Sequence, residues 1–356
     1  MNYLFYFVLN LLQIQFICNI TTVLIKTKQV IKKGKITMKK LTLALTAIAA
    51  AFTATAKADV SVSGSANAAF LSTAGASDNE ELAVGTTVDF GLSTTTASGM
   101  TISGGMSLST DYDSNNGSTA DGGRAVTFGI NGTTIVVGDV EISDTIGAVG
   151  GVVNGPLDDA SDLDTSVASG FIDDDGLGVE ITTAVGAASL NISYVSNDMA
   201  DNHGVLNNTT SGDDSAMSAS IAVPMGAYTV TLGVADSDSG ESSSGAEISA
   251  AIGGGTAVIG YSNQTLGTGH ADLSVAGDSE VIGATYTMSL DADTTVAIGY
   301  QSAKDADSQS ATRADLSIER SIGGGASVYL DLRNLTGDTA SNADGSAIAF
   351  GTSVSF

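Results

Sequence analysis

The hydrophobic pattern after residue 58 alternates with a period of two and shows almost no helical period. In the stretch DVSVSGSANAAF, Val60, Val62 and Phe70 fall on one face, whereas positions 61, 63, 65 and 67 are Ser or Asn. Such alternation is typical of half-exposed β-strands. It predicts 16 strands, at 59–70, 81–92, 100–110, 124–130, 133–138, 177–184, 188–195, 215–223, 227–234, 246–252, 256–262, 280–290, 294–301, 312–320, 327–335 and 346–356.

The connections between these segments are short and long in turn. The short set is rich in turn residues, and Asn131-Gly132 is a strong signal for a two-residue hairpin. The long set is polar and acidic, for example at 72–80, 196–214 and 236–245. Short turns at one end and long loops at the other predict an up-and-down antiparallel meander.

The two faces of the strands differ in a way that favours a membrane protein. One face carries Leu, Val, Ile, Phe and Tyr with almost no charge, and segments of about 9–11 residues match a tilted bilayer crossing. The other carries Ser, Thr, Gly, Asn and scattered charges, too small to fill the interior that 16 strands enclose. The pattern therefore predicts an all-β, 16-stranded transmembrane β-barrel, apolar outside and wet inside.

Strand parity also assigns charged residues to the lumen. Two arginines fall on the inward face, while Arg124 lies at a strand mouth and Arg320 at a turn. The predicted lumen wall contains Arg313, Arg333, Asp89, Glu180, Glu247, Asp315 and Asp331.

Residues 38–58, MKKLTLALTAIAAAFTATAKA, have the layout of a secretory signal peptide: two lysines, an apolar run and a small-x-small ending. We expect cleavage between Ala58 and Asp59. The exported product then carries five basic residues against 39 acidic ones, a formal charge of −34, compared with −26 for the whole chain. The one cysteine, Cys18, precedes the signal, so disulfides and thiolate chemistry are excluded from the exported product.

A second apolar stretch, at 3–25, precedes the signal peptide. It is long enough to span a bilayer, so one interpretation is a transmembrane anchor. A complete export signal begins at Met38, however, and we interpret residues 1–37 as an extension from a misassigned start codon. Residues 59–356 then form the barrel domain.

The third long connection, at 139–176, greatly exceeds the others. Loops of this length are usually functional or disordered. Its apolar residues, Ile146, Val149, Val152 and Val153, predict an ordered segment packed against another part of the protein.

A signal peptide, 16 alternating strands, a terminal phenylalanine and an oversized third loop after a VGD strand end resemble the Gram-negative general porins, especially the shorter alphaproteobacterial type. The resemblance covers nearly all of residues 59–356 and is architectural rather than motif-based. It implies a homotrimer among outer-membrane lipids, with the third loop folded into the lumen as a constriction. On that loop the acidic candidates are Asp139, Glu141, Asp144, Asp158, Asp159, Asp162 and Asp164.

The resemblance also implies that Phe356 is part of the signal read by the barrel assembly machinery, and that the lumen wall carries a basic cluster opposite the loop. This chain departs from the family there, because few arginines are available. We therefore predict a preference for cations, since a lumen of one sign concentrates counter-ions.

The sequence gives little indication of catalysis, metal binding or nucleic-acid binding. His203 and His270 lie in polar loops, and no spacing suggests a catalytic pair, so we do not expect an enzyme. The segment DDDG at 173–176 lacks the helical calcium-loop pattern, although acidic loops of this kind could bind Ca²⁺ or Mg²⁺ without a resident cofactor. The acidic charge disfavours nucleic-acid binding.

Two functions remain. The first is an outer-membrane pore for passive diffusion of small hydrophilic solutes and ions. The second is a structural or adhesive surface barrel with a blocked lumen and ion-binding acidic loops.

Overall fold

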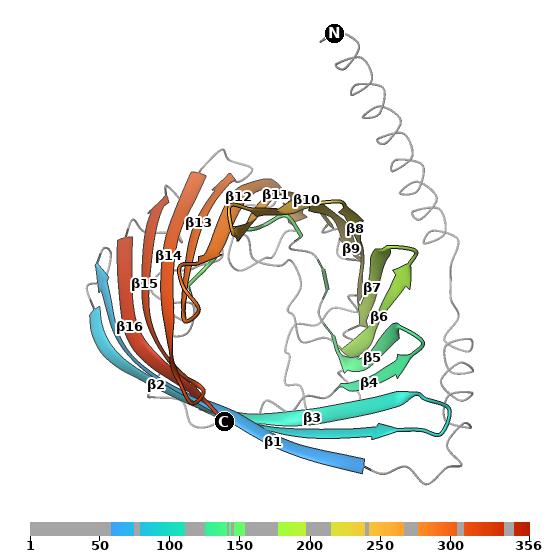
Figure 1. Ribbon diagram of the computed structural model, residues 1–356. Coiled ribbons are helices and arrows are strands. Elements are labelled where there is room, and N and C mark those ends of the chain that lie inside the picture. The colour runs from blue at the N-terminus through green and yellow to red at the C-terminus, as the bar shows by residue number, and fades with distance from the viewer. Residues whose placement is uncertain are drawn as a thin grey trace. The chain divides into compact units, whose positions relative to one another are not determined.

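The computed structural model describes residues 58–74, 79–110, 125–140, 142–143, 146–153, 177–196, 215–238, 242–266, 277–304, 310–337 and 345–356. Within these residues the chain forms one closed barrel of antiparallel strands, in which each strand pairs with its neighbours in sequence (Figure 1). None of the described residues belongs to a helix long and apolar enough to cross a membrane.

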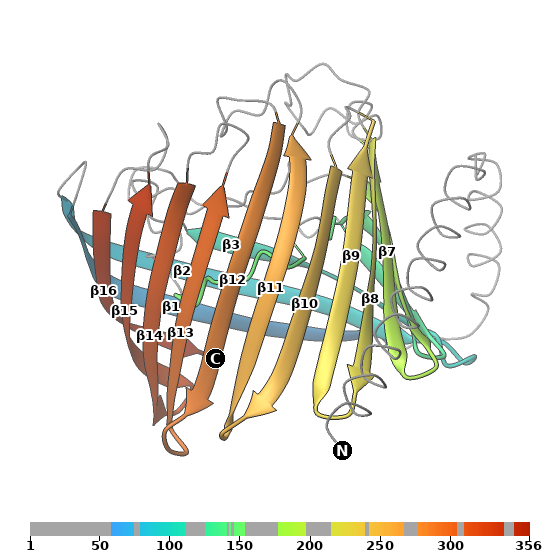
Figure 2. The same ribbon diagram turned by 90° about the horizontal axis from the view of Figure 1, so that it is seen from above.

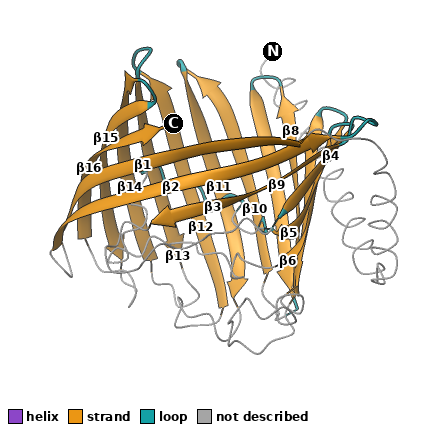
Figure 3. Cartoon of the chain, turned by 90° about the horizontal axis from the view of Figure 1, so that it is seen from below, coloured by secondary structure: helices purple, strands orange, loops and turns teal. Residues whose placement is uncertain are grey.

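The strands follow one another around the barrel without a crossover (Figures 2 and 3). Their bounds are β1 (Ala58–Ala74), β2 (Asn79–Thr95), β3 (Thr101–Thr110), β4 (Val126–Ile130), β5 (Thr133–Asp139), β6 (Leu177–Val185), β7 (Ala188–Ser196), β8 (Ser215–Met225), β9 (Tyr228–Ser237), β10 (Ser242–Ile252), β11 (Gly255–Leu266), β12 (Gly277–Ser289), β13 (Thr294–Lys304), β14 (Ser310–Gly323), β15 (Ala326–Gly337) and β16 (Gly345–Ser355).

The barrel closes where β1 pairs with β16, from Ser65 opposite Ser355 to Ala74 opposite Ser346. Closure satisfies the edge backbone groups along these residues, as a structure surrounded by hydrocarbon requires. The predicted 16-stranded, all-β, up-and-down barrel is confirmed.

Alternation places the large apolar side chains on the outer surface. Leu82 and Val84 are 71% and 52% exposed, whereas Ala83 between them is fully buried. The same holds in β16, where Ile348 and Phe350 are exposed and Ala349 is buried. Exposed apolar faces on successive strands are the surface that a barrel presents to lipid.

The short connections contain the expected turn residues. Asn131 and Gly132 join β4 to β5 with φ of 49° and 79°. Positive φ at both central residues is the requirement of a type I′ hairpin, which Asn-Gly meets at little cost. The hairpin predicted at this site is confirmed.

Strand lengths differ from the expected 9–11 residues, and range from 5 in β4 to 17 in β1 and β2. The predicted strands at 59–70 and 81–92 were too short because their ends carry Ser, Thr, Ala and Asn, which interrupt the apolar alternation. The β1–β2 ladder nevertheless continues to Thr73 opposite Asn79. Backbone hydrogen bonding therefore continues in these two strands past the residues in which apolar and polar side chains alternate.

The interior is less uniformly polar than predicted. One cluster of buried apolar residues includes Leu71, Val281 and Leu335, and Val153 of the third long loop packs within it. On β16 the cluster uses Ala347 and Ala349, which alternate with the outward residues. The loop therefore has an apolar contact surface on the inner wall.

Candidate functional site

The described part of the third long loop, residues 142–143 and 146–153, lies against the inner wall. In Figure 1 this segment is the green trace that follows the inner side of the strands from β8 to β13. Its backbone N–H groups donate to wall side chains: Ser143 N to Ser218 Oγ on β8 at 2.9 Å, and Gly147 N to Glu247 Oε1 on β10 at 3.0 Å. The loop is thus hydrogen-bonded to the barrel rather than free in the lumen.

Two further hydrogen bonds continue the attachment across the wall. Gln301 Nε2 on β13 donates to the carbonyl oxygen of Ala148 at 3.2 Å. Val152 N donates to Asp315 Oδ2 on β14 at 3.4 Å. Hydrogen bonds to carboxylates are stronger than neutral ones, so Glu247, which accepts from Gly147 N at 3.0 Å, is the principal anchor of this segment, and the longer contact to Asp315 adds to it.

Arg313, Asp315 and Arg333 form a buried ion cluster next to the loop. Arg333 Nε donates to Asp315 Oδ1 at 3.2 Å, and Arg313 Nε lies 3.2 Å from Asp315 Oδ2. The side chains of Asp315 and Arg333 are fully buried and that of Arg313 is 9% exposed. Gly151 of the loop lies directly over the Arg313 guanidinium group.

Asp331 is fully buried on the same face of β15 as Arg333. Asp315 and Asp331 thus lie on the two strands that carry Arg313 and Arg333, and these four buried residues sum to no net formal charge. The structure therefore brings Arg313, Asp315 and Arg333 of the predicted wall together beneath the loop, where all three side chains are buried.

The other predicted wall acids are partly exposed on the same inward face. Asp89 on β2 accepts a hydrogen bond from Ser107 Oγ at 2.5 Å, and Glu180 on β6 accepts one from Thr182 Oγ1 at 3.4 Å. Glu247 is partly buried by its contact with the loop. These acids lie on β2, β6 and β10, and so surround the lumen instead of meeting at one point.

Asp139 differs from its predicted place on the loop, because it is the last residue of β5 and pairs with Leu177 of β6. The β5–β6 ladder extends one residue past the predicted strand end. The remaining predicted loop acids lie outside the described residues: Glu141, Asp144, Asp158, Asp159, Asp162 and Asp164. Arg124, His203, His270 and the acidic segment 173–176 also lie outside them.

Arg320, predicted at a turn, lies in β14 close to the β12–β13 turn. Arg320 Nη1 is 3.3 Å from Asp291 Oδ2 and 2.6 Å from Thr294 Oγ1, and both members of the ion pair are about half exposed. The pKa of the Asp291 carboxyl is lowered, chiefly because Asp293 N donates to it, with smaller effects from Thr294 and Arg320. Unlike the two pairs at Asp315, this arginine–carboxylate pair is open to solvent.

The last residue of the chain belongs to the closing strand pair. Phe356 follows β16 and pairs with Gly64 of β1 through two backbone hydrogen bonds. Ala58 and Asp59, the predicted cleavage site, are the first residues of β1. Cleavage between them stays a prediction.

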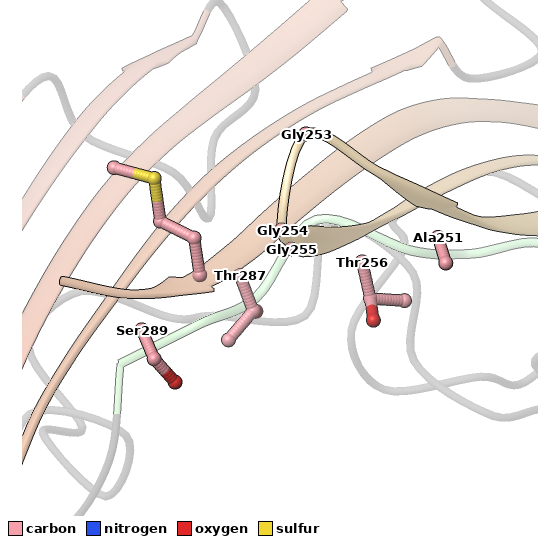
Figure 4. Close-up of a pocket in the computed structure, with 8 residues that line it drawn as sticks. Ala251, Gly253, Gly254, Gly255, Thr256, Thr287 and Ser289 are labelled. Atoms are coloured by element: carbon pink, nitrogen blue, oxygen red, sulfur yellow. The ribbon is translucent and has the colours of Figure 1, made fainter. Parts of the chain in front are cut away.

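A pocket of about 530 Å³ lies at the β10–β11 turn and the end of β12 (Figure 4). Its lining consists of glycine, small and hydroxyl residues and one methionine, with no charged group: Ala251, Gly253, Gly254, Gly255, Thr256, Thr287, Met288 and Ser289. Nothing in this lining points to catalysis or to ion binding.

Within the described part of the chain, no group of three or more His, Cys, Asp or Glu side chains could hold a metal ion. The acidic segment at 173–176 is not among those residues, so binding of Ca²⁺ or Mg²⁺ by the acidic loops stays a prediction.

Sequence reasoning missed the anchoring roles of Ser218 and Gln301, because such long-range contacts leave no local pattern. It also missed that wall glycines lie beneath the loop, as at Gly245, over which Ile146 passes. A glycine inside a strand is the one signal that was available, since it often marks close approach of another backbone.

Comparison with known proteins gives a consistent result. A family model described as Gram-negative porin matches residues 44–340. No curated protein matches the chain.

Among solved structures, a porin refined at 1.8 Å resolution is 20% identical, with a TM-score of 0.63, over 84% of this chain and 100% of that one. An OmpT loop L8 deletion mutant of Vibrio cholerae is 13% identical, with a TM-score of 0.63, over 84% and 99% of the two chains. The anion-selective porin of Comamonas acidovorans is 12% identical, with a TM-score of 0.61, over 84% and 100%.

At these identities the solved structures establish the fold. The family model covers most of the chain and includes nearly the whole barrel. The chain therefore belongs to the Gram-negative porin family, as an integral β-barrel channel protein of the outer membrane.

Proposed function

We propose that the protein is a passive, cation-preferring diffusion channel for small hydrophilic solutes and ions. The observation that carries this proposal is the burial of Arg313 and Arg333, the two arginines of the predicted wall, which share the carboxylate of Asp315 beneath the third long loop. Arginines buried in this way do not present a positive surface to a permeating ion.

The partly exposed acids then dominate the field in the lumen. Asp89 on β2 and Glu180 on β6 line the wall on strands that do not adjoin β14 or β15. A water-filled passage walled by low-dielectric protein concentrates ions of the opposite sign, so a net negative lumen favours cations. Solutes would pass through such a channel by diffusion, without coupling to an energy source.

We further propose that the protein is a homotrimer. The outer-membrane protein OmpT of Vibrio cholerae, 12% identical to this chain, has been solved in a trimer form. The broad apolar outer surface of β1 and β2, with Val60, Leu82 and Leu92 more than half exposed, would accommodate either lipid or a neighbouring copy.

The test of the cation preference is the reversal potential of the purified protein in a planar bilayer under a KCl gradient. We expect a potential of the sign set by K⁺. A potential of the sign set by Cl⁻ would refute the preference while leaving the channel intact. Asp89→Asn and Glu180→Gln should each reduce the potential.

The rival function, a structural barrel with a blocked lumen, is favoured by the burial of inward residues. Ser193, Val281 and Ala349 on three separated strands have no exposed surface. A blocked barrel would insert into a bilayer without conducting, which separates the two functions.

A further inference from the structure

Five glycines form a row across the inner wall beneath the third long loop. They lie on five successive strands, from β9 to β13, and we call them the glycine row: Gly233, Gly245, Gly260, Gly283 and Gly299. The strand register places Gly233 directly opposite Gly245, and Gly260 directly opposite Gly283.

The loop backbone occupies the space that side chains would fill at these positions. A methyl group on Gly245, Gly260, Gly283 or Gly299 would collide with the carbonyl oxygen of Ile146, Gly147, Val149 or Gly150, respectively. On Gly233 it would lie 3.0 Å from Ile146 Cβ, against the Ile146 side chain. A side-chain Cβ atom does not approach backbone atoms at these distances. The loop therefore lies in a groove of the inner wall that exists only because these positions are glycine.

The loop also has glycines where it contacts this groove of the wall. Gly147 and Gly150 have φ of 91° and 148°, a region that other residues rarely adopt. A methyl group on Gly147 would collide with the carbonyl oxygen of Tyr261, and one on Gly150 would lie 2.9 Å from that of Tyr300. Loop and wall are therefore in direct backbone contact over several strands.

Glycine inside a strand weakens it, since it adds backbone entropy and packs no side chain. Five such residues on adjacent strands point to a common requirement, and the passage of the loop backbone is the one that the contacts show. Any larger residue would hold the loop further from the wall and nearer to the axis of the lumen.

We propose that the glycine row sets the width of the lumen by recessing the loop into the wall, and so determines which hydrophilic solutes pass by size. This inference rests on the proposed function, because it concerns the passage of solutes through the lumen.

The wall strands are held more firmly than the loop, and this decides which of the two moves when a side chain is added at the glycine row. Every strand of the row is held in the ladder by both neighbouring strands. The described loop segment is held by the hydrogen bonds of Ser143, Gly147, Ala148 and Val152. A side chain inserted between loop and wall therefore moves the loop inward rather than the wall outward.

The test compares Gly260→Ala, Gly283→Ala and the double variant, each purified from outer membranes of an expressing host. We expect a graded loss of single-channel conductance, and a steeper loss of uptake into liposomes for larger sugars than for smaller ones. The matched control is Gly104→Ala on the outward face of β3, where the nearest atom to an added methyl group is Ala125 O at 3.3 Å. That variant should conduct like the unchanged protein.

A second variant keeps the inference testable if the double variant fails to fold. Deletion of residues 144–164 removes the part of the loop that lies over the row. In that background the two alanine substitutions should have no effect on conductance. An equal loss with and without the loop would overturn the proposal, as would folded double variants that conduct like the unchanged protein.

A further measurement tests the loop placement without requiring conduction. The exported chain is predicted to contain no cysteine, so Ile146→Cys with Gly233→Cys provides a single pair. The Cβ atoms of these positions lie close enough for a disulfide after small adjustment. We expect the bond to form on oxidation, as measured by mass, and its absence would overturn the placement.

The conductance and disulfide measurements distinguish failure of the channel function from failure of the sizing role of the glycine row. An unchanged protein that inserts without conducting, while the disulfide forms, contradicts the channel function and with it the sizing role. A conducting protein whose conductance ignores the glycine substitutions contradicts the sizing role alone.

Discussion

Gly64 and Phe356 exchange both of their backbone hydrogen bonds, each with an N···O distance of 3.0 Å. The aromatic ring of Phe356 lies against Gly64, so that a methyl group on Gly64 would be 2.8 Å from Phe356 Cζ. The last residue of the chain is thus a paired member of the closing ladder, and its ring needs a glycine opposite.

Deletion of Phe356 should greatly reduce the amount of folded barrel in the outer membrane. The side chain is 73% exposed in one barrel, so the loss of its burial cannot account for a large effect. We attribute the effect to lost closure and lost recognition by the assembly machinery. The measurement is the fraction of heat-modifiable protein on gels. Val354→Ala, which trims an outward residue of the same strand, is the control and should assemble normally.

The sequence predicted much of the fold because alternation and turn chemistry are local. Asn131-Gly132 identified its hairpin, and parity placed Arg313 and Arg333 on one face. The sequence could not show that these arginines share Asp315, because strand register joins residues that the pattern treats separately. The small number of arginines in the predicted wall argued against a strong basic cluster, and the structure adds that Arg313 and Arg333 are buried beside the loop.

The path of the loop was predictable only in outline. Apolar residues at 146, 149, 152 and 153 indicated an ordered segment, and Val153 does pack in an apolar cluster. The glycine row escaped notice because single glycines are common in this chain, with 43 in total. Their alignment across strands appears only when the register is known.

Arg333→Met should destabilise the barrel far more than Arg320→Met. Removing one member of a buried ion pair costs about 3–5 kcal/mol, and although Asp315 keeps Arg313, it loses the fully buried Arg333 that donates to its Oδ1. An exposed pair such as Arg320–Asp291 contributes roughly 0–1 kcal/mol. The free energy of unfolding in urea, measured in the same detergent for both variants, checks the difference. Equal losses would contradict the assignment of the two environments.

Glu247→Ala should loosen the loop without unfolding the barrel. The substitution removes the carboxylate that accepts the hydrogen bond of Gly147 N, one of the charged anchors of the segment. We expect a noisier single-channel current with altered mean conductance at an unchanged unfolding midpoint. Ile248→Ala, on the outward face of the same strand, is the matched control. A quiet, unaltered current in Glu247→Ala would show that this anchor is dispensable.

Deletion of residues 144–164 should raise the single-channel conductance. The described part of this segment, residues 146–153, runs along the inner wall and packs inside the barrel, so its removal leaves more of the lumen to water. The folded state of the deletion variant is checked by its heat-modifiable mobility. If the deletion variant conducts like the unchanged protein, the narrowest point of the lumen lies outside this segment.

Asp291 should titrate below its ordinary pKa of 3.8. The lowered pKa means that this group stabilises the folded state fully above its unfolded pKa, and that the stabilisation is lost as the pH falls through the folded pKa. The carboxyl ¹³C shift of Asp291 measures the titration. Arg320→Met should raise the pKa only in part, because the hydrogen bond from Asp293 N is the larger cause. A return to the ordinary value in that variant would contradict this order of causes.

The most direct test of the channel function is the single-channel conductance of the purified protein in a planar bilayer. The account predicts stepwise insertion of open, water-filled channels that conduct without any energy source. Protein that inserts in folded, heat-modifiable form and passes no current would contradict it, and would favour a structural barrel with a closed lumen.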